Sequence, residues 1–184
     1  ASAYGSAQIS DDSFFYTRVQ VCKSTNGTLD NPEEKNCTRY PNNYYKPVGN
    51  LQKYSDRVRV AAFGYLIDNN QQRYGGVLRA PMKFVGPTTY DTSTNQASVN
   101  ANVEWDANTG IFKTNPEART ENQSGVINYL NKFGRLSGSA TYKTYDPVAE
   151  LYYEALRYVQ GLDPTPQAYS GTLSTALTEG FPVY

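Results

Sequence analysis

The chain has 184 residues, which suits one domain and is long enough to bury a hydrophobic core. Its 17 Lys and Arg residues balance its 17 Asp and Glu residues, so there is no electrostatic reason to expect nucleic acid or an anionic membrane as a partner. No apolar run approaches the ~20 residues that cross a bilayer, which predicts no membrane insertion. Abundant Asn, Gln, Ser and Thr with little Lys favour a secreted protein.

The N-terminal part combines a predicted strand with a predicted disulfide. Apolar and polar side chains alternate over residues 13–21, which indicates a strand. Cys22 and Cys37 then flank a polar loop rich in turn residues, and a local disulfide is the natural pairing in an oxidising compartment. It would stabilise the fold by about 3 kcal/mol. The alternative is two reduced thiols in a cytosolic protein.

The next segment predicts a short helix and a strand. Residues 47–55 are expected to be helical, with Pro47 in the first turn and with Leu51 and Tyr54 facing inward. In the strand expected at residues 58–67, both faces are apolar beyond Val60. Such a strand is covered on both sides, as is typical of a central strand in a layered α/β sheet.

A second strand follows a hairpin turn predicted at residues 68–70. It is expected to open at Gly76 and to point Arg79 and Lys83 outward, with Pro81 marking a sheet edge or a bulge. The side chains expected to face inward are Leu78, Ala80, Met82 and Phe84.

The C-terminal half predicts one hairpin and two helices. Residues 86–101 are expected to form a loop, and residues 102–113 a hairpin that turns at residues 106–110. A short helix is expected over 125–133, with Val126, Ile127, Leu130 and Phe133 inward. A longer helix is expected over 146–160, capped by Asp146 with Pro147 in its first turn. Its apolar stripe comprises Val148, Leu151, Tyr152, Ala155, Leu156 and Val159.

Little in the sequence supports catalysis. There is no histidine, which excludes Ser–His–Asp and Cys–His nucleophiles and removes the commonest general base at neutral pH. The carboxylate pairs Glu104 with Asp106 and Glu150 with Glu154 are interpreted as solvated surface acids. A carboxylate hydrolase would need two acids in one pocket, one of them with a raised pKa.

The sequence offers a candidate metal site in one predicted turn. Asp106 and Asn108 present oxygen ligands at alternate positions, like the start of a calcium loop. The glutamate and the longer loop of an EF-hand are missing, so a plain turn is favoured and no cofactor is predicted.

Four segments, in order, carry a resemblance to a known family: KPVGNLQKYSDRVRV, FGYLIDNNQQRYGGVLRAPMKFVGP, GVINYLNKFG and YDPVAELYYEALRYVQGL. Together they resemble the N-terminal half of the type IV pilus tip adhesins of the PilC/PilY family. The resemblance implies an α+β fold, part of a von Willebrand factor A-like region, with a mixed sheet, β-hairpins, two or three helices and one local disulfide. Residues 1–184 would be a single domain cut from a larger adhesin region. The Asp-x-Ser-x-Ser metal motif of such A domains is absent, so metal-dependent binding is not carried over.

The resemblance implies a non-enzymatic, extracellular component of the pilus tip that supports pilus assembly, adhesion and surface sensing. Its expected partners are minor pilins or the pilus fibre, and a host or abiotic surface. The predicted contact residues are the tyrosines Tyr40, Tyr44, Tyr45 and Tyr90. The alternative is a carbohydrate-binding module that stacks exposed Trp105 or tyrosines on sugar rings.

Overall fold

The computed structural model describes residues 19–67, 76–132, 147–166, 168 and 172–184. Most of the strand predicted at 13–21 lies outside these residues, and residues 19–21 are not part of a strand. The predicted turn at 68–70 and the residues Phe133 and Asp146 also lie outside. No described helix is long and apolar enough to span a membrane.

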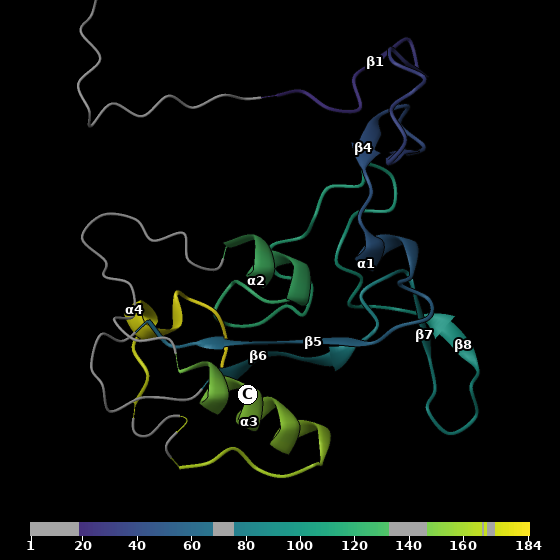
Figure 1. Ribbon diagram of the computed structural model, residues 1–184. Coiled ribbons are helices and arrows are strands. Elements are labelled where there is room, and N and C mark those ends of the chain that lie inside the picture. The colour runs from purple at the N-terminus through teal and green to yellow at the C-terminus, as the bar shows by residue number, and fades with distance from the viewer. Residues whose placement is uncertain (1–18, 68–75, 133–146, 167, 169–171) are drawn as a thin grey trace, which may run out of the picture.

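The central feature is an antiparallel hairpin between two helices (Figure 1). It consists of β5 (Val60–Tyr65) and β6 (Gly76–Lys83), with α2 (Val126–Lys132) on one face and α3 (Val148–Val159) on the other. The prediction of a strand covered on both sides is therefore confirmed. The prediction of a central strand in a larger sheet is not, because each described sheet has two strands and each pairing is antiparallel.

Close packing holds the two helices against the hairpin. A Cβ atom added to Gly64 of β5 would lie 1.7 Å from the hydroxyl oxygen of Tyr129 in α2, so only glycine fits there. On the other face, the rings of Phe63 and Tyr158 meet edge to face with centroids 5.6 Å apart.

The face assignment predicted for β6 is right for Ala80, which is buried, and wrong at two other positions. Arg79, expected to face outward, is fully buried, whereas Met82, expected to face inward, is exposed. The Arg79 guanidinium donates to the carbonyl oxygen of Thr178 at 2.8 Å and lies over the ring of Tyr129. Because α2 and its neighbours cover this face, the arginine is buried with polar and π partners. The predicted irregularity at Pro81 is confirmed, since the pairing register shifts beside it.

The main core lies between the hairpin, α2 and the C-terminal residues. Its buried members are Tyr40, Ala62, Ala80, Val85, Trp105, Val126, Ile127, Tyr129 and Phe181. A smaller cluster contains Leu66, Val77 and Ala168. In α2 the prediction is right for Val126 and Ile127 and wrong for Leu130, which is exposed while Tyr129 takes the inward position.

Three short hairpins complete the described strands. They pair β1 (Ser24–Thr25) with β2 (Thr28–Leu29), β3 (Cys37–Arg39) with β4 (Tyr45–Pro47), and β7 (Thr88–Tyr90) with β8 (Ala97–Val99). The last of these corrects the prediction that residues 86–101 form only a loop. The predicted turn at 106–110 is confirmed: the Gly110 N–H donates to the Asp106 carbonyl oxygen, and Trp105 bridges to Phe112.

Two short helices remain, α1 (Asn50–Lys53) and α4 (Thr175–Thr178). The helix predicted at 47–55 is shorter than expected, because Pro47 belongs to β4 and Gly49 precedes the first turn. The Gly49 N–H donates to the side-chain oxygen of Gln52, which stabilises that start. Leu51 packs against the core as predicted, but Tyr54 is exposed.

Candidate docking surfaces

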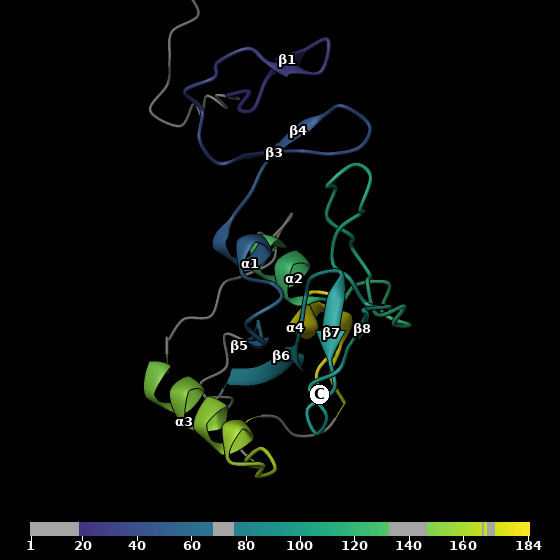
Figure 2. The same cartoon turned by 90° about the vertical axis from the view of Figure 1, so that its right-hand side faces the viewer.

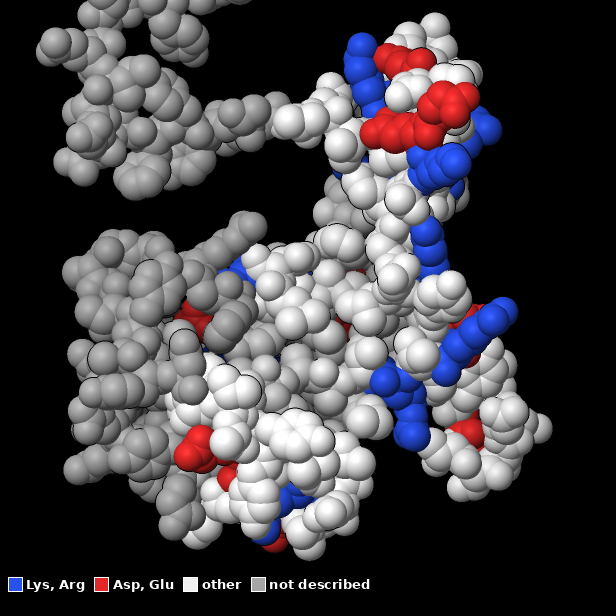
Figure 3. Space-filling view, in the orientation of Figure 1, with Lys and Arg blue, Asp and Glu red and all other residues white. Residues whose placement is uncertain are grey.

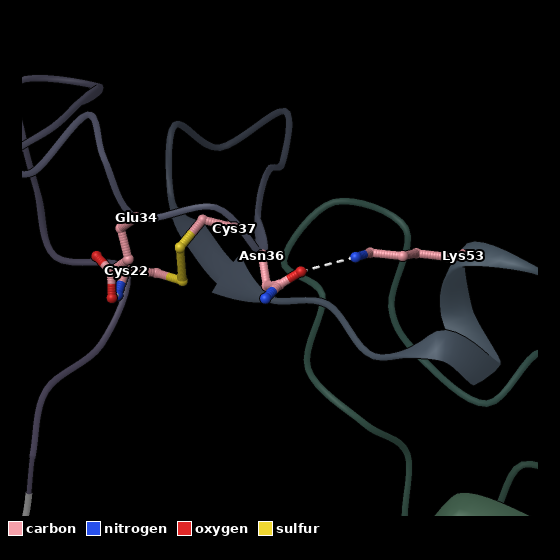
Figure 4. Close-up of a disulfide and its surroundings, with 5 residues drawn as sticks. All are labelled: Cys22, Glu34, Asn36, Cys37 and Lys53. Atoms are coloured by element: carbon pink, nitrogen blue, oxygen red, sulfur yellow. Dashed lines mark hydrogen bonds between the residues drawn. A yellow bond between two sulfur atoms is a disulfide. The ribbon is translucent and has the colours of Figure 1, made fainter.

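The N-terminal hairpins form a lobe held by a disulfide. Cys22 and Cys37 are bonded, as predicted, and the Glu34 carboxylate accepts a hydrogen bond from the Cys22 N–H at 2.8 Å (Figure 4). We call residues 22–47 the disulfide lobe. It stands away from the β5–β6 hairpin in both views (Figures 1 and 2), so much of its surface does not contact that hairpin.

A groove of about 640 Å³ lies where the disulfide lobe meets α1 and the core. Its lining residues are Lys35, Asn36, Cys37, Thr38, Tyr40, Val48, Gln52, Lys53, Ser55, Pro87 and Trp105. Tyr40 and Trp105 belong to the main core, and each keeps only a small exposed fraction, 9% and 8%. Lys53 Nζ donates to Asn36 Oδ1 at 2.7 Å and so joins the α1 side of the groove to the lobe (Figure 4).

Cations gather on this part of a neutral chain. Residues 35–59 contain a single acid, Asp56, and the cations Lys35, Arg39, Lys46, Lys53, Arg57 and Arg59. Only Arg57 lies near a carboxylate among the described residues, with Nε 3.9 Å from Asp56 Oδ1. Figure 3 shows Lys and Arg side chains on the disulfide lobe and along the edge of the molecule below it, with Asp and Glu side chains beside them on the lobe. The acids of the lobe, Asp30, Glu33 and Glu34, do not line the groove, whereas Lys35 and Lys53 do. The described lining of the groove is therefore positive.

Three of the four tyrosines predicted to make contacts come from the β3–β4 region, and the fourth lies elsewhere. Tyr44 is exposed and Tyr45 half-buried. Tyr40 is buried beside Gly110, so it offers little area to a partner; burial also raises the pKa of its hydroxyl. Tyr90 is half-buried in β7, edge to face with Phe84. A binding role for these tyrosines stays a prediction.

The burial of Trp105 corrects one part of the carbohydrate-binding alternative. Trp105 packs in the main core and reaches the surface only at the groove, so it offers no open indole face to a sugar ring. Exposed tyrosines such as Tyr44 and Tyr152 are present, and stacking of sugars on tyrosines stays a prediction.

The apolar stripe predicted for the longest helix mostly faces outward. Val148, Tyr152, Leu156 and Val159 of α3 are exposed, and Leu151 and Ala155 are partly buried. Leu151 packs on the hairpin as predicted, since a Cβ atom added to Gly76 of β6 would lie 1.7 Å from its Cδ1. The same side of α3 carries Glu154, which is buried, and Tyr158, whose hydroxyl accepts from the Met82 N–H. The predicted cap is also corrected, because Pro147 precedes the first helical residue.

Two acids interpreted as solvated are buried. Glu104 accepts hydrogen bonds from the N–H groups of Val126 and Ile127 at 2.8 and 2.7 Å, at the start of α2, and lies 3.1 Å from Lys83 Nζ. Glu154 accepts from the N–H and the hydroxyl of Thr165. The sequence did not predict their burial, because hydrophobic periodicity identifies buried apolar residues and gives no signal for a buried glutamate.

The acids around Lys83 form one structural cluster. Lys83 also pairs with Glu117, which accepts from the Tyr184 hydroxyl. Burial, together with this hydrogen bond, raises the pKa of Tyr184. Each carboxylate in the cluster is engaged with donors of the protein itself, so the arrangement ties the start of α2 and the C-terminal residue to β6.

The calcium candidates lie in a self-contained turn. Asp106 Oδ1 accepts from the N–H groups of Asn108 and Thr109 and from the Thr109 hydroxyl. These donors, the Thr109 hydroxyl first, lower the pKa of Asp106. Among the described residues one group of three possible ligands lies close together, Cys22, Glu34 and Cys37, and the disulfide engages both of its sulfurs. A metal role for Asp106 and Asn108 stays a prediction.

The described residues thus form a small α+β module with a disulfide lobe, a basic groove and an exposed helix face. A family model described as the second domain of PilY1 homologs matches residues 67–181. A type IV pilus biogenesis factor PilY1 homolog from Xylella fastidiosa is 42% identical over 161 residues, which cover 82% of this chain and 13% of that protein.

The chain therefore belongs to the PilY1 homolog family, which confirms the resemblance at the level of the family. No solved structure matches it.

Proposed function

We propose that this chain is a non-enzymatic docking module of a type IV pilus biogenesis factor. The observation that carries the proposal is its 42% identity to a protein of that description. The chain spans only 13% of that relative. We therefore propose for this module one contact role within a larger protein, and not the whole activity of a pilus factor.

The described residues support a role in contact rather than in chemistry. The buried carboxylates of Glu104 and Glu154 and the half-buried one of Glu117 are each held by donors of the protein. In contrast, the groove and the outer face of α3 present unoccupied area to a partner. Surfaces of this kind are typical of interaction sites.

The proposed location and role of the module go beyond its family membership. We propose that the module works outside the cell at the pilus tip, where it supports assembly, adhesion and surface sensing through minor pilins or the pilus fibre. The Cys22–Cys37 disulfide suits an oxidising compartment. Residues 1–184 would be one domain of the larger region. That these residues form part of a von Willebrand factor A-like region stays a prediction, and the described two-stranded antiparallel hairpins do not add support to it.

A capture experiment tests the docking function. The purified, oxidised chain is immobilised and offered the minor pilins and pilus fibres of its source, with a Cys22→Ser, Cys37→Ser variant in parallel. Saturable capture supports the proposal, and its loss in the variant places the disulfide lobe in or beneath the contact. If a folded chain captures neither minor pilins nor fibres, the docking function is wrong and a glycan array becomes the next measurement.

A further inference from the structure

We propose that the groove between the disulfide lobe and α1 binds an extended acidic segment of a partner protein, with an apolar side chain of that segment seated over Trp105. This inference rests on the proposed docking function and names the chemistry of the partner. Three features of the groove carry it: its charge, its apolar floor and the strand edge in its wall.

The charge of the groove determines whether it prefers an acidic or a basic partner. Lys35 and Lys53 are exposed lining residues on opposite sides, one from the lobe and one from α1. Lys46 pairs with Thr38 across the β3–β4 hairpin, so its side chain lies on the same face of that hairpin as Thr38, another lining residue. None of these lysines has an ion pair with a described carboxylate. Because complementary charges favour association and like charges oppose it, the groove prefers an acidic segment.

The floor of the groove gives it an apolar centre. Val48, Pro87, Tyr40 and Trp105 contribute to the lining beneath the lysines. Lysines around an apolar centre resemble the general plan of an interface, in which a buried apolar contact is surrounded by a polar rim. A leucine-sized or aromatic side chain flanked by Asp or Glu has the matching pattern.

One wall of the groove offers backbone groups to an extended chain. The Val48 N–H donates to the Asn36 carbonyl oxygen and the Tyr40 N–H to the Tyr44 carbonyl oxygen, so Asn36 and Tyr40 point their backbone groups toward β4. Because these groups alternate along an antiparallel strand, those of Cys37 and Arg39 point away from β4. No hydrogen bond joins them to another described residue. An extended segment is therefore able to add to this edge by main-chain hydrogen bonds.

The disulfide fixes that wall. Cys37 is both a residue of β3 and a lining residue, and its bond to Cys22 ties β3 to the start of the lobe (Figure 4). The wall is thereby held in place before a partner arrives, which lowers the entropic cost of binding.

The position of Trp105 makes the proposal directly testable, because it is the single tryptophan of the chain and lines the groove. The oxidised chain is titrated with two short peptides, one alternating Asp with Leu and one alternating Lys with Leu, while Trp105 emission is recorded. We expect a saturable change with the acidic peptide alone. In the Lys35→Gln, Lys53→Gln double variant we expect its Kd to rise about tenfold, since each exposed ion pair contributes a factor of a few.

Lys132→Gln is the matched control, because Lys132 belongs to α2 and is not a lining residue of the groove. Its Kd should equal that of the unmodified chain. The groove assignment is overturned if neither peptide changes the emission, if the Lys peptide binds equally well, or if the double variant binds the acidic peptide with unchanged Kd. Capture of minor pilins that survives in the double variant would overturn the groove and leave the docking function intact. Peptide binding without any capture would support the groove and refute the docking function.

Discussion

Replacement of Glu104 by alanine should strongly destabilise the described fold. Glu104 is 1% exposed, and its two oxygens accept from the N–H groups of Val126 and Ile127. Alanine would leave these two donors without their acceptor, at about 1–3 kcal/mol each, and would break a buried ion pair, a change that typically costs about 3–5 kcal/mol. Because Lys83 keeps Glu117 as a partner, most of the ion-pair cost is avoided, and we expect the two donors to set the loss at about 3–4 kcal/mol, within their combined range of about 2–6 kcal/mol.

Urea unfolding monitored by Trp105 fluorescence measures this loss. For a chain of this size each kcal/mol corresponds to about 2–4 °C in Tm, so a thermal melt should fall by roughly 6–16 °C. Glu104→Gln keeps one carbonyl acceptor and should lose less than alanine does. Glu150→Ala, at an exposed acid of α3, should change the free energy of unfolding by less than about 0.5 kcal/mol. A Glu104→Ala variant within about 1 kcal/mol of the unmodified chain would refute the assigned role of this carboxylate.

Three further changes test other parts of the structure. Gly64→Ala places a Cβ atom against the Tyr129 hydroxyl and should cost about 1–3 kcal/mol in urea unfolding; an unchanged midpoint would contradict the packing of α2 on β5. The pKa of Asp106 is lowered from 3.8, so its charged form contributes stability above pH 3.8 that is lost as the pH falls below that value. Asp106→Asn should therefore be less stable than the unmodified chain at neutral pH and lose this difference in acid, whereas a pH-independent difference would exclude the carboxylate as its source. Val148→Lys and Val159→Lys should each leave Tm nearly unchanged, since these side chains are 63% and 70% exposed; a fall of several degrees would show that α3 is covered.

Local chemistry explains why some elements were predictable from the sequence. The turn at Asp106–Gly110 forms from hydrogen bonds within a few residues, and Gly110 has the positive φ that favours glycine. The Cys22–Cys37 pair closes a short loop, so the entropic cost of bringing its two ends together is small. Features that form between residues close in sequence depend little on the rest of the fold.

Burial of charged groups was not predictable in the same way. Arg79 and Glu104 have the composition of surface residues, and only the approach of distant segments supplies their partners: Thr178 and Tyr129 for the arginine, the start of α2 for the glutamate. A buried charge needs such partners to be tolerated, and no periodicity in the sequence reports them. The same limit explains why the groove was missed, because its lining comes from the lobe, from α1 and from Trp105.

The apolar stripe of α3 shows what hydrophobic periodicity does and does not report. The spacing correctly predicted a helix, but the side that meets the hairpin combines Leu151 with Glu154 and Tyr158, while Val148 and Val159 face outward. Glu154 is compatible with burial because Thr165 donates to both of its oxygens. A period of 3.6 residues identifies an apolar face and contains no information on which neighbour covers it. The exposed part of this apolar face is not used by the described residues, so substitutions at Val148 and Val159 should change the stability of the described fold little.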